Sequence, residues 1–131
     1  DKLFPTLTQP SFGVCLGMQL LCEHPEEGDT DLLGIIPLPV KRFQTELKVP
    51  HMGWNQLEKL QSPLFAGIAE GEFAYYVHSY YVPVSEYTLA QTAYPDPFSA
   101  ALQYKNFYAA QFHPEKSGAA GSQILKNFLA L

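Results

Sequence analysis

The sequence predicts an α/β domain with a mixed β-sheet and flanking helices, and three features of the chain lead to this fold class. The first is a series of short runs rich in β-branched and aromatic residues and broken by Pro, Gly, Asp and Asn, at residues 72–84, 88–94, 99–104 and 106–112. The second is a closing helix at residues 119–131, whose apolar positions share one face. The third is a short apolar strand at 11–14 that leads directly into a helix. Strands combined with helices in this way build a layered α/β structure.

The composition is that of one globular domain spanning residues 1–131. Hydrophobic residues make up 47% of the chain and charged residues 16%, and no apolar run is long enough to span a membrane. The formal net charge is −5 and the 8 Lys and Arg residues are scattered, which argues against a nucleic-acid partner. Cys15 and Cys22 lie about two helical turns apart on the predicted helix, too far for a disulfide, so we expect a reducing, cytoplasmic setting.

The first strand and the first helix meet at Cys15, within Gly13-Val14-Cys15-Leu16-Gly17. G-x-C-x-G is the cysteine form of a nucleophile elbow, a sharp strand-to-helix turn that exposes the reactive side chain. A sulfur in the first turn of a helix also lies near backbone N–H groups and the positive end of the helix dipole, which favour the thiolate. Taken alone, the pattern is equally compatible with a structural cysteine in a tightly packed turn.

The elements that follow are short. Apolar positions 16, 20 and 21 predict a helix over 16–23, and a polar turn follows at 25–29. Prolines among apolar residues predict an extended edge segment within 32–43. At 62–67, a Ser-Pro start and a Gly stop predict a single helical turn capped by the serine.

Residues 48–55 combine the only tryptophan with His, Met and Gly, and they follow neither the helical nor the strand period. We expect a surface loop that presents Trp54 to a partner. A tryptophan folded back onto the core is the alternative.

A second chemical cluster ends the last predicted strand, at Phe112-His113-Pro114-Glu115. A cysteine nucleophile needs a base to take its proton and a third group to orient that base, and His113 with Glu115 supplies both. Residues at the carboxyl ends of neighbouring strands converge, so Cys15 and His113 are expected to meet. His78 is the competing base, but it has no nearby carboxylate in the sequence and is better explained as a packed or substrate-lining residue. No set of His, Cys and acidic residues has the spacing of a metal site, so we expect no metal and no cofactor.

These motifs together resemble the class I glutamine amidotransferases. The stretches that carry the likeness are Gly13–Gln19, Val77–Tyr80 and Phe112–Glu115. Within that family, Pro50–Asn55 and His113–Gly118 are similar to the glutaminase subunit of imidazole glycerol phosphate synthase, an enzyme of histidine biosynthesis. The resemblance implies a flavodoxin-like fold and hydrolysis of L-glutamine to glutamate and ammonia.

The resemblance also implies roles for individual residues. Cys15 attacks the side-chain amide of glutamine to give a thioester, His113 relays the proton to the leaving ammonia, and Glu115 orients His113. The substrate and oxyanion contacts that the family pattern implies are Gln19, Glu27, the backbone of Ser79 and Tyr80, and the N–H group of Leu16.

A protein partner is implied as well. Met52, Trp54, Tyr75 and Lys116 match the family's face toward a (βα)₈-barrel cyclase subunit, which receives the ammonia through a tunnel.

The sequence departs from the family at its N-terminus. Members have several βα units before the cysteine strand, and one carries a Gly-rich loop that supplies a second oxyanion donor, whereas only about ten residues precede the strand here. Losing one donor costs roughly 10² to 10³ in rate, so we expect a truncated domain with weak or no activity alone.

Three other interpretations fit parts of the sequence. One is a glutaminase domain of another amidotransferase. A cysteine hydrolase of the α/β-hydrolase type is another, although its acid normally lies between nucleophile and histidine, whereas Glu115 follows His113. The third is a catalytically inactive interaction fragment with a structural Cys15 and a partner-binding Trp54.

Overall fold

The computed structural model describes residues 11–14, 18, 22–25 and 36–131. Its elements are β1 (Ser11–Val14), β2 (Glu23–Pro25), β3 (Pro39–Arg42), β4 (His51–Gln56), η2 (Pro63–Phe65), β5 (Phe73–His78), β6 (Tyr80–Tyr81), β7 (Thr88–Ala93), β8 (Pro97–Tyr104), β9 (Phe107–Ala110), η3 (Pro114–Lys116) and α2 (Gly118–Leu129).

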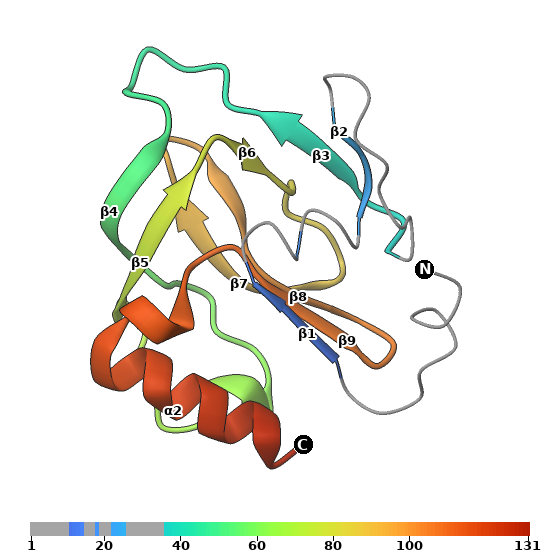
Figure 1. The fold of residues 1–131 in the computed structure, drawn as a ribbon, viewed down its shortest axis with the longest axis vertical. Helices are drawn as coiled ribbons and strands as arrows, with labels where there is room; N and C mark the ends of the chain where they lie inside the picture. Colours follow the sequence, from blue (N-terminus) through green and yellow to red (C-terminus); the bar gives the residue numbers. More distant parts are fainter. Residues whose placement is uncertain (1–10, 15–17, 19–21, 26–35) are drawn as a thin grey trace.

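The largest sheet has the strand order β1-β9-β8-β7. β7, β8 and β9 are antiparallel neighbours, and β1 joins them in parallel along β9, as Figure 1 shows. The sheet is therefore mixed, as the sequence predicts. Because β1 is parallel to β9, the carboxyl ends of the two strands lie at the same edge of the sheet.

A second layer of strands lies beside this sheet. β4 and β5 form an antiparallel pair, while β6 pairs with β3, which in turn pairs with β2. The β4–β5 pair is tied to the large sheet through the Thr92 hydroxyl, which donates to the Gln56 carbonyl oxygen at 2.9 Å. Ser79 separates β5 from β6, so the chain changes strand partner at that residue.

The main core lies between the β4–β5 pair, the large sheet and α2. Tyr76, Phe98, Phe112 and Ile124 are fully buried there. Burying a large apolar side chain stabilises a fold by about 2 kcal/mol, so this cluster accounts for much of the packing energy. Phe128 of α2 also packs on the β1 side chain of Phe12, with ring centroids 4.9 Å apart.

Most of the predicted elements are confirmed. The strands expected between residues 72 and 112 are β5 to β9, the closing helix is α2, and β3 lies within the expected extended segment. η2 begins after Ser62, whose hydroxyl accepts from the Leu64 N–H group at 3.0 Å, as the capping pattern predicts. The expected turn at 25–29 falls mostly outside the described residues.

Two expectations are wrong. The helix over 16–23 does not reach its predicted end, because Glu23–Pro25 is β2 and pairs in parallel with β3. The loop expected at 48–55 is largely strand β4, which pairs with β5 over all six of its residues. Gly53 occupies an inward position of β4 without a side chain, which obscures the alternation that would have identified the strand.

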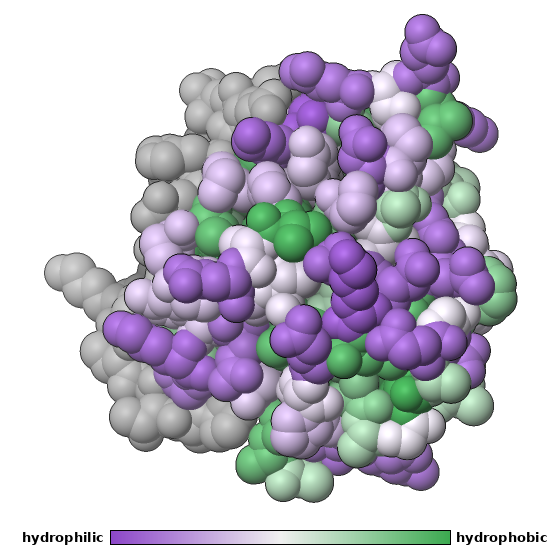
Figure 2. Space-filling model, turned by 180° about the vertical axis from the view of Figure 1, so that it is seen from behind, coloured by the Kyte–Doolittle hydropathy of each residue, from purple (hydrophilic) through white to green (hydrophobic). Residues whose placement is uncertain are grey.

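The described part of the face in Figure 2 is polar for the most part. Figure 2 shows hydrophilic side chains interspersed with small apolar patches on the face opposite to that of Figure 1. Among the described residues, no helix is long and apolar enough to cross a membrane.

Candidate active site

The candidate site begins with the parallel pairing of β1 and β9. Val14 is in register with Ala110, so β1 and β9 end at the same edge of the sheet. Gln111, Phe112 and His113 follow β9 directly, and Cys15 follows Val14 in the sequence. Cys15 itself lies outside the described residues, as do Leu16, Gln19 and Glu27. The strand arrangement is nevertheless the one that convergence of the cysteine and the histidine requires.

The side chains of His113 and Glu115 lie within ion-pair distance of each other. The His113 Nδ1 atom lies 3.3 Å from Oε2 of Glu115, and the two side chains are 21% and 55% exposed. A carboxylate at Nδ1 favours the tautomer with its proton there, which leaves Nε2 as the basic nitrogen. His113 is therefore oriented as a general base needs to be, and its partial exposure leaves it accessible.

The backbone of His113 is held against β5. Its N–H group donates to the Tyr75 carbonyl oxygen at 2.9 Å. Buried Ser117 completes the clamp, because its hydroxyl donates to the His113 carbonyl oxygen at 2.6 Å and accepts from the Tyr75 N–H group at 2.9 Å. These hydrogen bonds thus fix the backbone position from which the His113 imidazole extends.

Close packing of α2 supports the same turn. A Cβ atom on Gly121 would lie 1.9 Å from the Pro114 carbonyl oxygen, so only glycine lets the helix approach η3 this closely. Neither Gly121 nor Ser117 has a role among the sequence-based expectations. Ser117 lies inside the His113–Gly118 motif, which was a usable signal, whereas nothing local identifies Gly121.

Ser79 and Tyr80, expected to hold the substrate carboxylate through their backbone, lie at the β5–β6 junction and are half-buried. The Ser79 carbonyl oxygen accepts from the Phe43 N–H group at 3.1 Å, and the Tyr80 carbonyl oxygen lies 2.7 Å from His78 Nδ1. These contacts give the junction a defined backbone shape.

His78 is a packed residue rather than a base. It is buried, and both of its ring nitrogens have hydrogen-bond partners, the Tyr80 carbonyl oxygen and His51 Nδ1. Burial lowers the pKa of His78 to about 3. A group that binds protons this weakly and has no free nitrogen is unsuited to general base catalysis, so His113 stays the candidate for that role.

The four residues expected at a protein interface lie on or beside the outward face of the β4–β5 pair. Met52 and Trp54 are each 55% exposed, and the Trp54 ring makes an edge-to-face contact with the ring of its cross-strand partner Tyr75, with centroids 5.7 Å apart. Lys116 is exposed in η3, next to the turn that holds His113. The face therefore adjoins the candidate catalytic turn.

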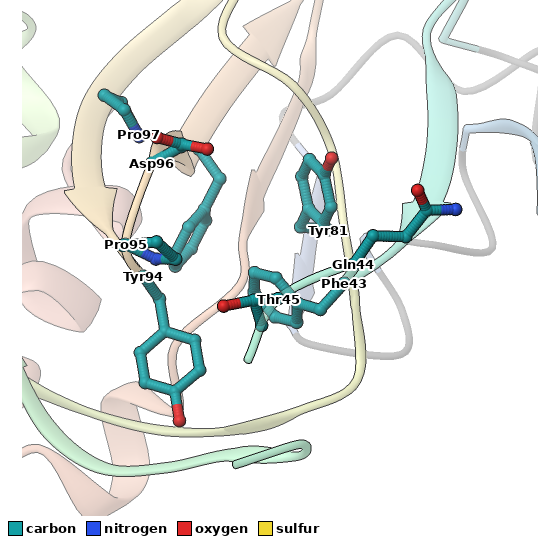
Figure 3. A pocket seen from close by; sticks show the side chains of 9 residues that line it. Phe43, Gln44, Thr45, Tyr81, Tyr94, Pro95, Asp96 and Pro97 are labelled. Carbon is teal, nitrogen blue, oxygen red and sulfur yellow. The ribbon is translucent and has the colours of Figure 1, made fainter. Parts of the chain in front are cut away.

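A metal site and a ligand pocket are the other kinds of functional site to consider in the described part of the chain. No group of three or more His, Cys, Asp or Glu residues there is arranged to hold a metal ion. A small pocket is lined mainly by aromatic and proline residues, with none of the predicted site residues among them (Figure 3). This pocket is therefore separate from the described residues of the candidate site.

Comparison with known proteins identifies the family. The profile of the class-I glutamine amidotransferases matches residues 2–131. The chain is 58% identical over 134 aligned positions to "Imidazole glycerol phosphate synthase subunit HisH" of Bacteroides thetaiotaomicron, covering 100% of this chain and 68% of the relative. It is 52% identical to the protein of the same name from Escherichia coli O157:H7, covering 98% of this chain and 67% of that protein.

Solved structures show the same fold at low sequence identity. A putative GMP synthase protein from Thermoplasma acidophilum superposes with a TM-score of 0.73 at 20% identity, covering 98% of this chain and 60% of that one. A glutamine amidotransferase from Thermotoga maritima gives a TM-score of 0.60 at 17% identity, covering 92% and 47%. The chain spans about two thirds of the length of the curated relatives. It belongs to the class-I glutamine amidotransferase family, as its cysteine and histidine motifs predict.

Proposed function

We propose that this chain is the glutaminase part of an imidazole glycerol phosphate synthase, which releases ammonia from L-glutamine and passes it to a cyclase subunit. The names of its relatives support this assignment, at 58% identity over the whole chain for the Bacteroides thetaiotaomicron protein. The structural observation that supports the proposal is the parallel register of Val14 with Ala110, because β1, the strand before Cys15, ends at the same sheet edge as β9, the strand that leads to His113.

The chemistry follows from the residue types. His113 Nε2 takes the proton of the Cys15 thiol, and the thiolate attacks the side-chain amide carbon of glutamine. The tetrahedral intermediate breaks its C–N bond as His113 returns the proton to the nitrogen, so that ammonia leaves and a glutamyl thioester remains. Water, deprotonated by His113, then hydrolyses the thioester to glutamate. Glu115 holds the imidazole in the required tautomer and stabilises its charged form.

The remaining site residues bind the substrate and the oxyanion. We assign the α-carboxylate of glutamine to the backbone of Ser79 and Tyr80, and its α-amino group to Glu27. Gln19 contacts the substrate, and the N–H group of Leu16 donates to the oxyanion of the tetrahedral intermediate.

We assign the cyclase, a (βα)₈-barrel protein, to the face formed by Met52, Trp54, Tyr75 and Lys116. Aromatic residues and Met are enriched at protein interfaces, and Met52 and Trp54 are both exposed on this face. The face adjoins the His113 turn, which suits transfer of ammonia between subunits. A cytoplasmic setting, with neither nucleic acid nor membrane as a partner, is part of the same proposal.

A glutamine-like electrophile tests the catalytic assignment. We expect mass spectrometry to find the adduct on Cys15 in the complex with the cyclase, with no adduct in Cys15→Ser and slowed labelling in His113→Asn. Labelling of Cys22 alone would contradict the proposal. Absence of labelling in a correctly folded complex would favour the interaction fragment with a structural cysteine.

A further inference from the structure

A series of side-chain hydrogen bonds crosses the interior of the β4–β5 pair and has no part in the proposed chemistry. His51 and His78 are cross-strand partners and are only 3% and 5% exposed. His51 Nδ1 lies 2.9 Å from His78 Nε2, and His78 Nδ1 lies 2.7 Å from the Tyr80 carbonyl oxygen. At the other end, the Asn55 amide nitrogen lies 3.2 Å from His51 Nε2 and 3.0 Å from the Ala93 carbonyl oxygen. We call this series, from Ala93 to Tyr80, the histidine chain.

Its two ends permit one arrangement of protons. The Tyr80 carbonyl oxygen only accepts, so neutral His78 carries its proton on Nδ1 and presents a lone pair at Nε2. His51 then donates from Nδ1, and its Nε2 accepts from Asn55. The Asn55 amide cannot be flipped without losing a hydrogen bond, because its oxygen accepts from the Gln56 N–H group at 2.8 Å. The network thus assigns one tautomer to each imidazole.

The surroundings of the two imidazoles are aromatic. The Tyr94 ring stacks on His51 with centroids 4.0 Å apart, and the rings of Phe43 and Phe98 each lie 5.1 Å from that of His78. These three rings also line the pocket of Figure 3. The surrounding ring faces cannot replace a lost hydrogen bond, so each polar group of the histidine chain depends on its neighbours in that chain for its hydrogen bonds.

The ionisable groups nearby also favour neutral imidazoles. Burial lowers the pKa of His51 to about 4, and burial is likewise the main cause of the lowered pKa of His78. The contact with Tyr80 opposes this change, whereas the charges of His51 and His113 add to it. Tyr76, whose ring stacks on His51, has a pKa raised by burial and also stays neutral. No carboxylate in the described segments forms an ion pair with either ring.

The histidine chain meets the backbone where the strand changes partner. β5 pairs with β4 as far as His78, and β6 pairs with β3 from Tyr80 onward. Ser79 lies between them, with its carbonyl oxygen bonded to the Phe43 N–H group. The hydrogen bond between His78 Nδ1 and the Tyr80 carbonyl oxygen spans this change of strand partner, so the imidazole holds the β5–β6 junction in one conformation.

We propose that His51, His78 and Asn55 are positioning residues for glutamine, because their hydrogen bonds hold the Ser79–Tyr80 backbone in the orientation that receives the α-carboxylate. This inference rests on the proposed glutaminase function. A backbone N–H group binds an anion well only when it points at it, and small rotations weaken the bond steeply. Loss of the histidine chain is therefore expected to weaken substrate binding more than it slows the chemical step.

The test compares two variants in the full chain, including any segment that precedes Asp1, in complex with the cyclase. His78→Leu removes both hydrogen bonds of the imidazole, and we expect the KM for glutamine to rise about tenfold with little change in kcat. His78→Asn places an amide N–H group near the former Nδ1 and can still donate to the Tyr80 carbonyl oxygen. We expect its KM to stay within about threefold of the wild-type value.

Two further variants separate positioning from stability. His51→Leu leaves His78 in place but removes its donor, and we expect a smaller rise in KM in the same direction. Tyr76→Phe serves as the matched control, since it removes a buried hydroxyl bonded to Thr92 beside His51 without touching the histidine chain. We expect a lower Tm for the control and an unchanged KM.

An unchanged KM in folded His78→Leu would overturn the inference, and so would equal KM values for the Leu and Asn variants. A rise in KM in Tyr76→Phe that matches its loss of Tm would do the same, since stability alone would then explain the effect. If the wild-type complex shows no labelling of Cys15 and no glutaminase activity, the proposed function has failed instead, and the two failures are thereby distinguished.

Discussion

At the scale of single residues, three histidines in one small region differ because their surroundings differ. His113 is partly exposed and has a carboxylate at Nδ1. His51 and His78 are buried among aromatic rings and bonded to each other. The first environment suits the proton transfer proposed for His113, and the second suits the fixed tautomers proposed for His51 and His78.

Because His51 and His78 are buried, we expect the protein to lose stability in acid. The pKa values of His51 and His78 are lowered from 6.5 to about 4 and about 3, so below pH 6.5 the unfolded chain binds more protons than the folded one. The free energy of unfolding is therefore expected to fall as the pH drops from 6.5 towards 4, by up to about 1.4 kcal/mol per pH unit for each histidine. Urea unfolding at a series of pH values measures this slope.

Variants locate the source of that slope. His78→Asn removes one titrating group and is expected to show a shallower fall in stability between pH 6.5 and 4. Tyr76→Phe is destabilised without loss of a histidine, so it should keep the wild-type slope at a lower stability. Identical slopes for His78→Asn and the wild type would mean that other groups carry the effect.

At the scale of elements, the turn of η3 is built by its neighbours rather than by its own residues. Ser117 ties the turn to β5 through two hydrogen bonds, and α2 packs on it through Gly121. The position of His113 thus depends on a strand and a helix that are distant from each other in sequence. Substitutions in α2 are expected to alter the catalytic turn without contact with substrate.

Gly121→Ala tests this dependence. The new methyl group would overlap the Pro114 carbonyl oxygen, so η3 and α2 must separate. We expect a loss of about 2–4 kcal/mol in the free energy of unfolding and a lower kcat.

Gly118→Ala is the matched control for that variant. Gly118 has a φ of +63° with nothing within 4 Å of the added Cβ, so only backbone strain of about 1 kcal/mol is expected. Equal destabilisation of the two variants in denaturant unfolding would show that close packing at Gly121 is not the cause.

At the scale of the whole molecule, one sheet edge and one exposed face lie next to each other. β5 contacts the His113 turn that follows this edge and also forms part of the exposed face, because the Tyr75 backbone holds the turn while the Tyr75 side chain contacts Trp54. The proposed catalytic centre and the proposed docking face therefore share a strand. Docking and catalysis are expected to be separable by substituting side chains that point outward.

Trp54→Ala is the substitution that makes this separation. The ring is 55% exposed, so we expect little change in Tm but a weaker affinity for the cyclase, by about 30-fold in Kd. Leu129→Ala removes an apolar side chain that is 82% exposed on α2 and should leave the affinity unchanged. Titration calorimetry measures both, and equal Kd values for Trp54→Ala and the wild type would place the cyclase elsewhere.

Local patterns were sufficient for much of the fold. The β-branched runs, the capped turn at Ser62 and the closing amphipathic helix all encode their structure within a few residues, and each is confirmed. β4 was not predictable in this way, because Gly53 interrupts its alternation and its pairing with β5 lies beyond any local window. β2 was missed for the same reason, since its parallel partner β3 is what makes it a strand.

The groups needed for the proposed glutaminase chemistry were predictable from the amino-acid pattern alone, because Cys15, His113 and Glu115 lie within short motifs. The three-dimensional fold sets which of the described groups lie together. The register of β1 on β9, the clamp at Ser117 and the contact between His51 and His78 arise from long-range packing and strand pairing. Such contacts depend on the summed free energy of the whole fold, which no short pattern of residues contains.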